Sequence, residues 1–298
     1  MAKHKMINIE SLKNRDGYLF LMPALVVLLA VLIVPLLTSL ILSFVKWNYM
    51  DPGSVITFVG IQNFISTLKN PQDINSFKVT FLFMSVSIVL ELVLGISIAL
   101  LLNGKFKGLN IFRNLMILPM MVAEVVAALC WRYMLQSDFG IVNYFLKIMH
   151  IGAQAWTDQS HALISIIVIE VWQNTPFVIL IILAALQSLP TDTMEAADVD
   201  GANYFRKLFA IIFPVIRPQI LIVLVFRTMF ALRAFTQPWV LTGGGPADKT
   251  LVLGIDIYRK AFRYYDMGLA NSLSWILILV TLCIVIAYIS LLDKEDYS

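Results

Sequence analysis

The sequence predicts an all-α integral membrane protein with six transmembrane helices and, after the fourth, a helix–glycine–helix loop outside the bilayer. The 298 residues are 59% hydrophobic and 14% charged, whereas soluble domains average about 45–50% apolar and about 25% charged residues. The apolar residues form runs that can cross a bilayer, which takes about 20 residues of helix. One polar stretch, residues 190–218, interrupts these runs with regular helix signals. The chain therefore divides into an N-terminal segment (1–18), a membrane domain (19–292) and a tail (293–298).

The predicted spans are separated by polar segments rich in turn residues. They cover about 19–45, 79–102, 111–133, 161–189, 220–241 and 269–292. The first run is too long for the core of a signal peptide, so we expect it to be retained. Pro23 and Pro35 are expected to kink or shorten it, and Pro119 lies inside the third span. A short amphipathic piece is expected at 141–149, in the loop before the fourth span.

The polar stretch after the fourth span carries signals for two short helices. Asp192 and Glu195 have the spacing of a capping box, which predicts a helix start. Gly201 is expected to end this helix, because glycine readily takes the left-handed conformation that follows a helix. Asn203 is expected to cap the second helix, which Pro214 is expected to end.

Basic residues predict which side of the membrane each loop faces, because they gather on the cytoplasmic side. With an even number of spans, both chain ends and the 190–218 loop share one side. That side carries Lys3, Lys5, Lys13, Arg15, Lys105, Lys107, Arg113, Arg206, Lys207 and Arg217. The other side carries Lys249, Arg259, Lys260 and Arg263, in a longer loop where the rule counts less. We therefore expect both termini in the cytoplasm.

Several classes of function are disfavoured by composition. The net charge of +3 and the lack of a basic stripe argue against a nucleic-acid partner. Cys130 and Cys283 lie in apolar runs, so no disulfide framework follows, and three histidines offer few ligands for a metal site. No grouping of catalytic residues is apparent, so we do not expect an enzyme.

A glycine-rich segment after the fifth span resembles a phosphate-binding loop only superficially. That motif needs glycine directly before its lysine, whereas Asp248 precedes Lys249 here. A carboxylate at this position would repel phosphate, so ATP binding by this chain is rejected.

Polar side chains inside the fourth and fifth spans form a candidate solute wall. Charged groups within the bilayer usually face a bundle interior or a wet cavity. Planar rings beside amide and charged groups suit a sugar, which presents hydroxyls at its rim and C–H groups on its faces. The wall residues are Glu170, Trp172, Gln173, Asn174, Phe177, Phe230, Arg233 and Gln237. Glu170 and Asn174 are expected to share one helix face, as are Arg233 and Gln237.

Each of these polar groups has a second interpretation, because it could instead satisfy an interhelical hydrogen bond or ion pair. Arg227 and Arg233 favour an anionic solute if they face it. They would carry no such preference if they pair with Glu91 or Glu170.

The 190–218 loop resembles the EAA loop of ABC importer permeases, in which Glu-Ala-Ala is followed by Asp-Gly-Ala and two spaced prolines. The matching positions are Glu195, Ala196, Ala197, Asp200, Gly201, Ala202, Ile211, Pro214 and Pro218, while Leu208 stands where an aromatic residue is usual. In that family the loop docks on a cytoplasmic ATPase. The resemblance therefore implies an ATPase-docking set of Glu195, Ala196, Ala197, Asp200, Gly201, Ala202 and Arg206.

Further segments resemble sugar permeases of the maltose and glycerol-phosphate type, in particular the first permease of each pair. They are 58–64, Arg113 with Leu118 and Pro119, and the outer segment 242–246 with Thr250, Tyr258, Phe262 and Gly268. The resemblance implies that Gly243, Gly244, Gly245 and Pro246 contact an extracellular solute-binding protein, and that the solute site lies in the fourth and fifth spans.

The resemblance implies a permease subunit of an ATP-driven importer for a sugar, oligosaccharide or related polyol, working by alternating access in a prokaryotic plasma (inner) membrane. Its partners would be a second permease subunit in a heterodimer, an ABC ATPase dimer, a solute-binding protein and the lipid bilayer. No cofactor is expected in this chain, because ATP and magnesium would bind the ATPase subunits. Two alternatives stay open: a membrane enzyme or assembly factor, and a proton-coupled secondary transporter that uses Glu91, Glu124 and Glu170.

Overall fold

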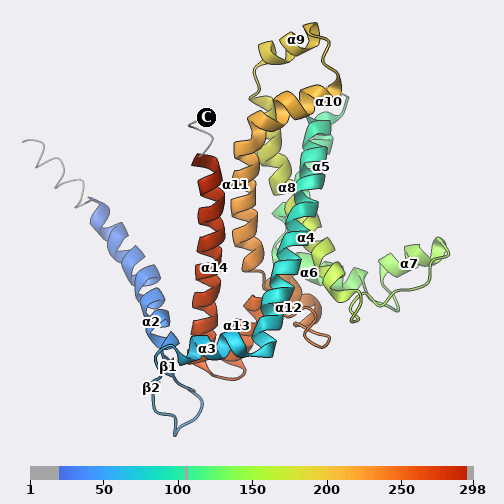
Figure 1. Ribbon diagram of the computed structural model, residues 1–298. Coiled ribbons are helices and arrows are strands. Elements are labelled where there is room, and N and C mark those ends of the chain that lie inside the picture. Colours follow the sequence, from blue (N-terminus) through green and yellow to red (C-terminus); the bar gives the residue numbers. More distant parts are fainter. Residues whose placement is uncertain (1–19, 105–106, 294–298) are drawn as a thin grey trace, which may run out of the picture.

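The computed structural model describes residues 20–104 and 107–293, which form long helices running side by side (Figure 1). Segment 1–18, Lys105 and most of the predicted tail lie outside the described residues. In chain order, the elements are a helix from residue 20 to 28, η1 (Leu29–Ile33), α2 (Val34–Ser43), β1 (Val45–Lys46), β2 (Thr57–Phe58), α3 (Gln62–Lys69), α4 (Pro71–Leu102), α5 (Leu109–Met121), α6 (Glu124–Met134), α7 (Ile141–Ile148), α8 (Ala162–Gln187), α9 (Thr191–Val199), α10 (Tyr204–Lys207), η2 (Leu208–Ile212), α11 (Phe213–Leu232), α12 (Thr236–Thr242), α13 (Leu253–Phe262) and α14 (Met267–Asp293).

Within the described part of the chain, 5 helices are long and apolar enough to cross a membrane, or up to 6 if one bent pair counts as a span. They are Phe20–Ser43, Pro71–Leu102, Ala162–Gln187, Tyr204–Leu232 and Met267–Ser290, and the bent pair is α5 with α6. The all-α membrane class is therefore confirmed. The predicted amphipathic piece forms α7.

The third span was predicted as one helix, which is wrong, because α5 and α6 meet at 97°. Pro119 near the end of α5 lacks a backbone N–H and so weakens the helix around it. Val122 and Ala123 then adopt extended backbone angles. The break frees the Val122 carbonyl, which accepts a hydrogen bond of 2.8 Å from Gln173 Nε2 on α8.

The second helix of the 190–218 loop does not end at Pro214, contrary to prediction. The chain stays helical from Tyr204 to Leu232, so the loop runs directly into the fifth span. The π-helical turn η2 precedes the proline, and the N–H of Phe213 bonds to the carbonyl of Leu208. Because the wider turn already shifts the hydrogen-bond pattern, the missing N–H of Pro214 in the first turn of α11 costs little.

The first span also has a π-helical turn just before a proline. The π-helical turn η1 ends two residues before Pro35, and the N–H of Val34 bonds to the carbonyl of Leu29. The π-helical turn accommodates Pro35 within one helix, Phe20–Ser43, which counts as one span, and the predicted kink stays a prediction.

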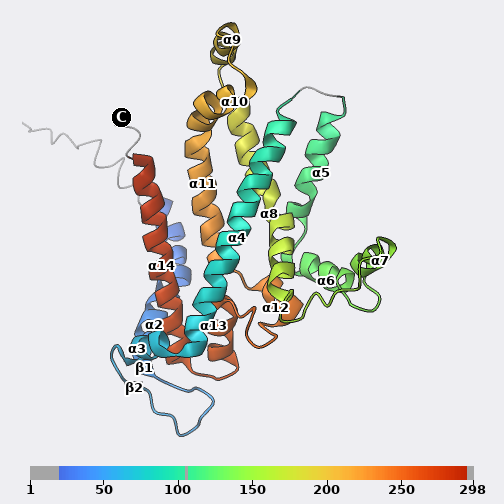
Figure 2. The ribbon, with the colours of Figure 1, turned by 45° about the vertical axis from the view of Figure 1, so that its right-hand side comes forward.

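Two views of the ribbon show how the elements are arranged (Figures 1 and 2). Helix α4 packs along α8, and α14 lies beside α11 and α2. Gly95 permits the close approach of α4 to α8, because a Cβ there would lie 2.6 Å from the Cβ of Val178. Helix α9 projects from one end of the bundle, whereas α3, α13 and the β1–β2 hairpin lie at the other.

Candidate functional sites: a membrane cavity and a projecting loop

The projecting loop is built around the left-handed turn at Gly201, as predicted. Its φ is 71°. The N–H of Ala202 donates to the carbonyl of Ala197 at 2.9 Å, and that of Gly201 to the carbonyl of Asp198 at 3.1 Å. This pair of bonds is the Schellman motif, which satisfies the last carbonyls of α9 and reverses the chain.

Of the two helix starts predicted in this loop, one agrees with the structure. Asn203 caps α10, because its side chain accepts a 2.8 Å bond from the N–H of Arg206. The prediction that Asp192 caps the first helix is wrong. Helix α9 begins at Thr191 with Pro190 at the cap position, so Asp192 lies in the first turn. Lys207 pairs with Asp198 and ties the second helix to the first.

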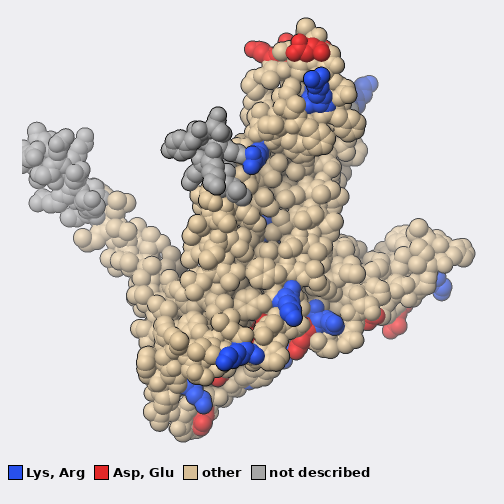
Figure 3. All heavy atoms as spheres, viewed as in Figure 1, with Lys and Arg blue, Asp and Glu red and all other residues tan. Residues whose placement is uncertain are grey.

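The predicted ATPase-docking residues differ in exposure. Glu195, Ala196, Asp200, Gly201 and Arg206 are exposed, Ala202 is partly buried, and Ala197 is only 7% exposed. Figure 3 shows acidic side chains at the tip of this end, with basic side chains next to them. The loop also presents two apolar side chains outside the predicted set, those of Val199 and Phe205, which are 88% and 67% exposed. Large apolar groups in an otherwise polar loop are the signal that could have revealed them.

A cavity of about 470 Å³ lies where the α5–α6 bend, α8 and the end of α11 meet. It is lined by Met120, Glu124, Glu170, Asn174, Phe177, Arg227, Phe230, Arg233, Ala234, Phe235, Thr236, Gln237 and Pro238. The structure thus brings together most of the predicted wall, namely Glu170, Asn174, Phe177, Phe230, Arg233 and Gln237.

Trp172 and Gln173 do not line this cavity. Trp172 packs edge-on against Trp131, with ring centroids 5.6 Å apart. Gln173 is buried behind the wall, where it links the freed Val122 carbonyl to Gln237, whose Nε2 donates to Gln173 Oε1 at 2.7 Å.

The predicted shared helix face of Arg233 and Gln237 is wrong. The fifth-span helix ends at Leu232, and α12 begins at Thr236 after a break in the chain. Both residues still line the cavity, because the break turns the chain across its wall. The break also adds Phe235 and Thr236, which the sequence analysis missed because it expected an uninterrupted span.

Arg227 faces two buried carboxylates on neighbouring helices. Its Nε and Nη2 donate to Glu91 at 2.6 and 2.8 Å, and Nη2 also donates to Glu170 at 2.5 Å. Arg227 is 2% exposed, Glu91 0% and Glu170 7%. Arg227, Glu91 and Glu170 therefore connect α11, α4 and α8 at the edge of the cavity. Arg227 pairs with protein carboxylates, which is the second of the two interpretations that the sequence left open.

The glycine-rich loop after α12, which the sequence places on the outer side, is held from within by Arg259 and Thr250. Arg259 donates to Asp248 at 2.9 Å and to the carbonyl of Gly243 at 2.8 Å, and Thr250 donates to the carbonyl of Gly245 at 2.6 Å. Gly244 is buried, and a larger residue would not fit there, because a Cβ would lie 2.9 Å from Arg259 Nη2. Of the predicted binding-protein contacts, Gly243, Gly245 and Pro246 are partly exposed, and Gly244 has an internal role.

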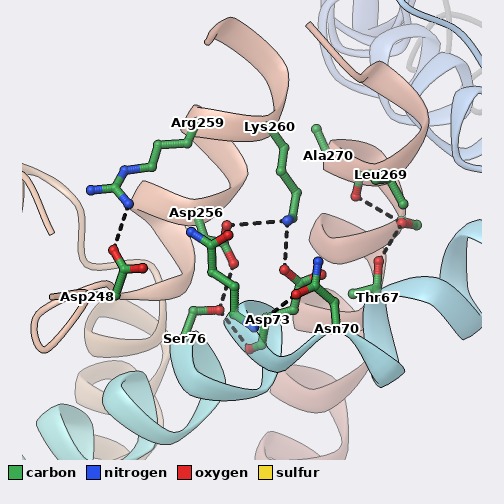
Figure 4. A network of polar contacts seen from close by, with 12 residues as sticks. Thr67, Asn70, Asp73, Ser76, Asp248, Asp256, Arg259, Lys260, Leu269 and Ala270 are labelled. Carbon is green, nitrogen blue, oxygen red and sulfur yellow. Dashed lines mark hydrogen bonds and ion pairs between the residues drawn. The ribbon is translucent and has the colours of Figure 1, made fainter. Parts of the chain in front are cut away.

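Beneath this loop, Lys260 of α13 lies between two buried acids of different helices (Figure 4). Its Nζ is 2.6 Å from Asp73 Oδ1 and 3.4 Å from Asp256 Oδ1, and Ser76 donates to Asp256 at 2.9 Å. Burial opposes the charge, but the hydrogen bond to Asp73 and the charges of both acids outweigh it and raise the pKa of Lys260. The cluster thus fastens α13 to the start of α4.

The raised pKa of Lys260 predicts a loss of stability at alkaline pH. The contribution is fully present below the ordinary lysine value of 10.5 and is lost as pH rises through the higher folded-state pKa. The melting temperature of the purified protein should therefore fall above pH 10.5. The Lys260→Arg variant, whose cation keeps its proton in this range, should lose less; an identical fall in both proteins would contradict the assignment.

Comparisons with known proteins agree with this architecture. Residues 91–294 match the family model described as "Binding-protein-dependent transport system inner membrane component". A probable ABC transporter permease of Sinorhizobium fredii is 37% identical over 265 residues, which cover 89% of this chain and 86% of the relative. The trehalose/maltose transport system permease MalF of Thermococcus litoralis is 33% identical over 287 residues, covering 94% and 95%.

Among solved structures, a chain of a bacterial ABC transporter involved in import of the acidic polysaccharide alginate shares the fold. The TM-score is 0.83 at 22% identity, over 97% of this chain and 99% of that chain. The family match covers most of the present sequence and includes the 190–218 loop, the cavity and the last span. The chain therefore belongs to the family of inner-membrane components of binding-protein-dependent transport systems.

Proposed function

We propose that this chain is one permease subunit of an ATP-driven importer for a sugar, oligosaccharide or related polyol, and that it works by alternating access. The observation that carries the proposal is a continuous helix, Tyr204–Leu232, between the projecting loop and a cavity lined by rings, amides and charges. Relatives named for trehalose and maltose transport support the substrate class. As a transport component, the chain moves its solute without chemical change.

The projecting loop is the proposed docking site for an ABC ATPase dimer, which would bind the ATP and magnesium. Exposed Glu195 and Arg206 supply charges, and Val199 and Phe205 supply apolar contacts. The docking end would face the cytoplasm, because Arg206, Lys207 and Arg217 lie there. The first described helix starts, and α14 ends, toward the α9 end of the bundle (Figure 1), which supports cytoplasmic termini.

The other proposed partners fit the remaining exposed surfaces. A second permease would pack beside the cavity, where Met121 and Val125 of the bent third span are 76% and 51% exposed. A solute-binding protein would dock at the opposite end, on the outer loop that Arg259 holds. A proton-coupled transporter is not favoured, because Glu91 and Glu170 are both engaged by Arg227.

Copurification and transport together test this proposal. The chain should copurify with an ATPase, and vesicles containing the full complex should accumulate solute only with ATP and binding protein. Glu195→Lys should release the ATPase by reversing an exposed docking charge. The matched control Asp138→Lys changes an exposed acid of the outer loop and should retain it. Uphill uptake driven by a pH gradient without ATP would overturn the proposal.

A further inference from the structure

We propose that residues 137–156, which we call the α7 arm, form an anchor that lies in the lipid–water boundary of the bilayer, toward the bundle end opposite α9. The arm extends sideways from the bundle between α6 and α8 (Figures 1 and 2). The proposed transport mechanism uses none of its residues. Its exposed apolar face, its charged edge and its height beside the bundle all fit a membrane surface.

Helix α7 presents an apolar face to its surroundings. Four apolar side chains, each between 48% and 63% exposed, share one helix face through their i, i+3, i+4, i+7 spacing, namely Ile141, Tyr144, Phe145 and Ile148. Asn143 and Lys147 lie four residues apart on the opposite face. Rings and branched chains on one side of a helix, with a lysine on the other, are typical of a helix that lies in the plane of a membrane interface.

Hydrogen bonds to Asn143 keep the apolar face turned outward. Asn143 is 5% exposed, and its Nδ2 donates to the carbonyls of Ser137 and Gln154 at 3.1 and 2.9 Å. Its Oδ1 accepts a 2.9 Å bond from Trp156 Nε1. The hydroxyl of Ser165 on α8 donates to the carbonyl of Trp156 at 2.8 Å, which ties the arm to the bundle. Because these bonds hold the polar side of α7 against its own loop, the apolar side points away from it.

The height of the arm beside the bundle indicates which medium surrounds it. In both ribbon views α7 lies at the height of α6, which belongs to the bent third span, and nearer to the α9 end than α3 and α13 do. The span that follows the arm, α8, exposes Ile164 and Val168 in its first two turns, so apolar surface begins at this height. A soluble partner that docks on the end formed by α3 and α13 would meet those elements first. The bilayer is therefore the occupant that the position favours.

The charged side chains of the arm are placed as a membrane surface requires. Figure 3 shows them along the edge of the arm that faces away from α9, while the rest of its visible surface is uncharged. In an interfacial segment, charged groups face water and apolar groups face the acyl chains. The long side chain of Lys147 can extend its cation to the headgroups, and the ring of Tyr144 is of the kind enriched at this boundary.

The test measures what surrounds single side chains of α7. Cys130 and Cys283 are replaced by serine, and Phe145→Cys, Ile148→Cys and the matched control Lys147→Cys are each labelled with a nitroxide. The full complex is placed in lipid nanodiscs. Electron paramagnetic resonance then measures collisions of each nitroxide with oxygen, which concentrates in lipid, and with a water-soluble nickel chelate. No transport is required, so the result is independent of the proposed function.

The ratio of oxygen to nickel collisions should be at least about threefold higher at positions 145 and 148 than at position 147, because the apolar face would lie among acyl chains. Adding the binding protein should leave these ratios unchanged. Should Phe145→Cys or Ile148→Cys prevent assembly, Ile141→Cys repeats the measurement on the same face.

Two other patterns would overturn the proposal. If the nickel chelate reaches positions 145 and 148 as readily as position 147, the face lies in water. If both reagents are excluded from positions 145 and 148, with or without binding protein, the face lies against another protein subunit.

Discussion

Replacing Gly201 by proline should abolish solute-stimulated ATP hydrolysis, with a loss of about a hundredfold or more, because the proposed docking loop would no longer be correctly placed. Proline fixes φ near −65°, whereas Gly201 has a φ of 71°. Proline also lacks the N–H that donates to the carbonyl of Asp198. The chain reversal between α9 and α10 would be lost, while the helices of the membrane domain would be unaffected.

The matched control is Gly201→Asn, since asparagine accepts left-handed backbone angles better than other side chains and keeps the N–H. This variant should retain most of the ATPase stimulation. Hydrolysis is measured with the reconstituted complex and loaded binding protein, and size-exclusion chromatography checks that the complex is intact. Equal activity in the proline variant and the unmodified protein would remove the loop from the coupling mechanism.

Replacing Arg227 by methionine should destabilise the membrane domain by about 3–5 kcal/mol, because two carboxylates would lose the cation that compensates them inside the bundle. Glu91 is 0% exposed, so water cannot substitute for the lost partner. We expect the variant to express poorly and to melt at a markedly lower temperature in detergent. The measurement is fluorescence-monitored thermal unfolding of the purified protein.

A triple variant separates the loss of charge compensation for the two carboxylates from the loss of packing by the Arg227 side chain. Combining Arg227→Met with Glu91→Gln and Glu170→Gln removes all three charges, and much of the lost stability should return. If the triple variant melts no higher than Arg227→Met alone, the ion pairs described for Arg227 are not the source of its stabilising effect.

Six of the eight predicted wall residues line the cavity for a physical reason, and their binding of solute stays a prediction. Charged and amide side chains are costly in lipid, so Glu170, Asn174 and Arg233 had to face a protein interior or a wet space. Their spacing could not show whether they faced solute or one another. Arg227 illustrates this limit, because its partner Glu91 comes from a helix 136 residues away in the chain.

The failures came from backbone features that residue types do not reveal. Pro214 was expected to end a helix, but a π-helical turn just before it lets the helix continue. Pro119 was expected to be tolerated inside a span, but α5 and α6 bend by 97° a few residues later. The side chain of Gln173, on another helix, compensates the freed carbonyl there. In both cases tertiary hydrogen bonding or a local change of helix type decided the outcome.

The helix of 29 residues from Tyr204 to Leu232 has a mechanical consequence. The π-helical turn η2, Pro214 and Pro218 interrupt its regular hydrogen bonds, and the ribbon bends between α10 and α11 (Figure 1). Helix α11 beyond this bend has 20 residues, or about 30 Å at a rise of about 1.5 Å per residue, so tilting it by about 10° displaces its far end by about 5 Å. Because Phe230 lies two residues from that far end and lines the cavity, a small tilt of α11 would move the cavity wall by this distance in the proposed alternating-access cycle, with the bend at η2 as the pivot.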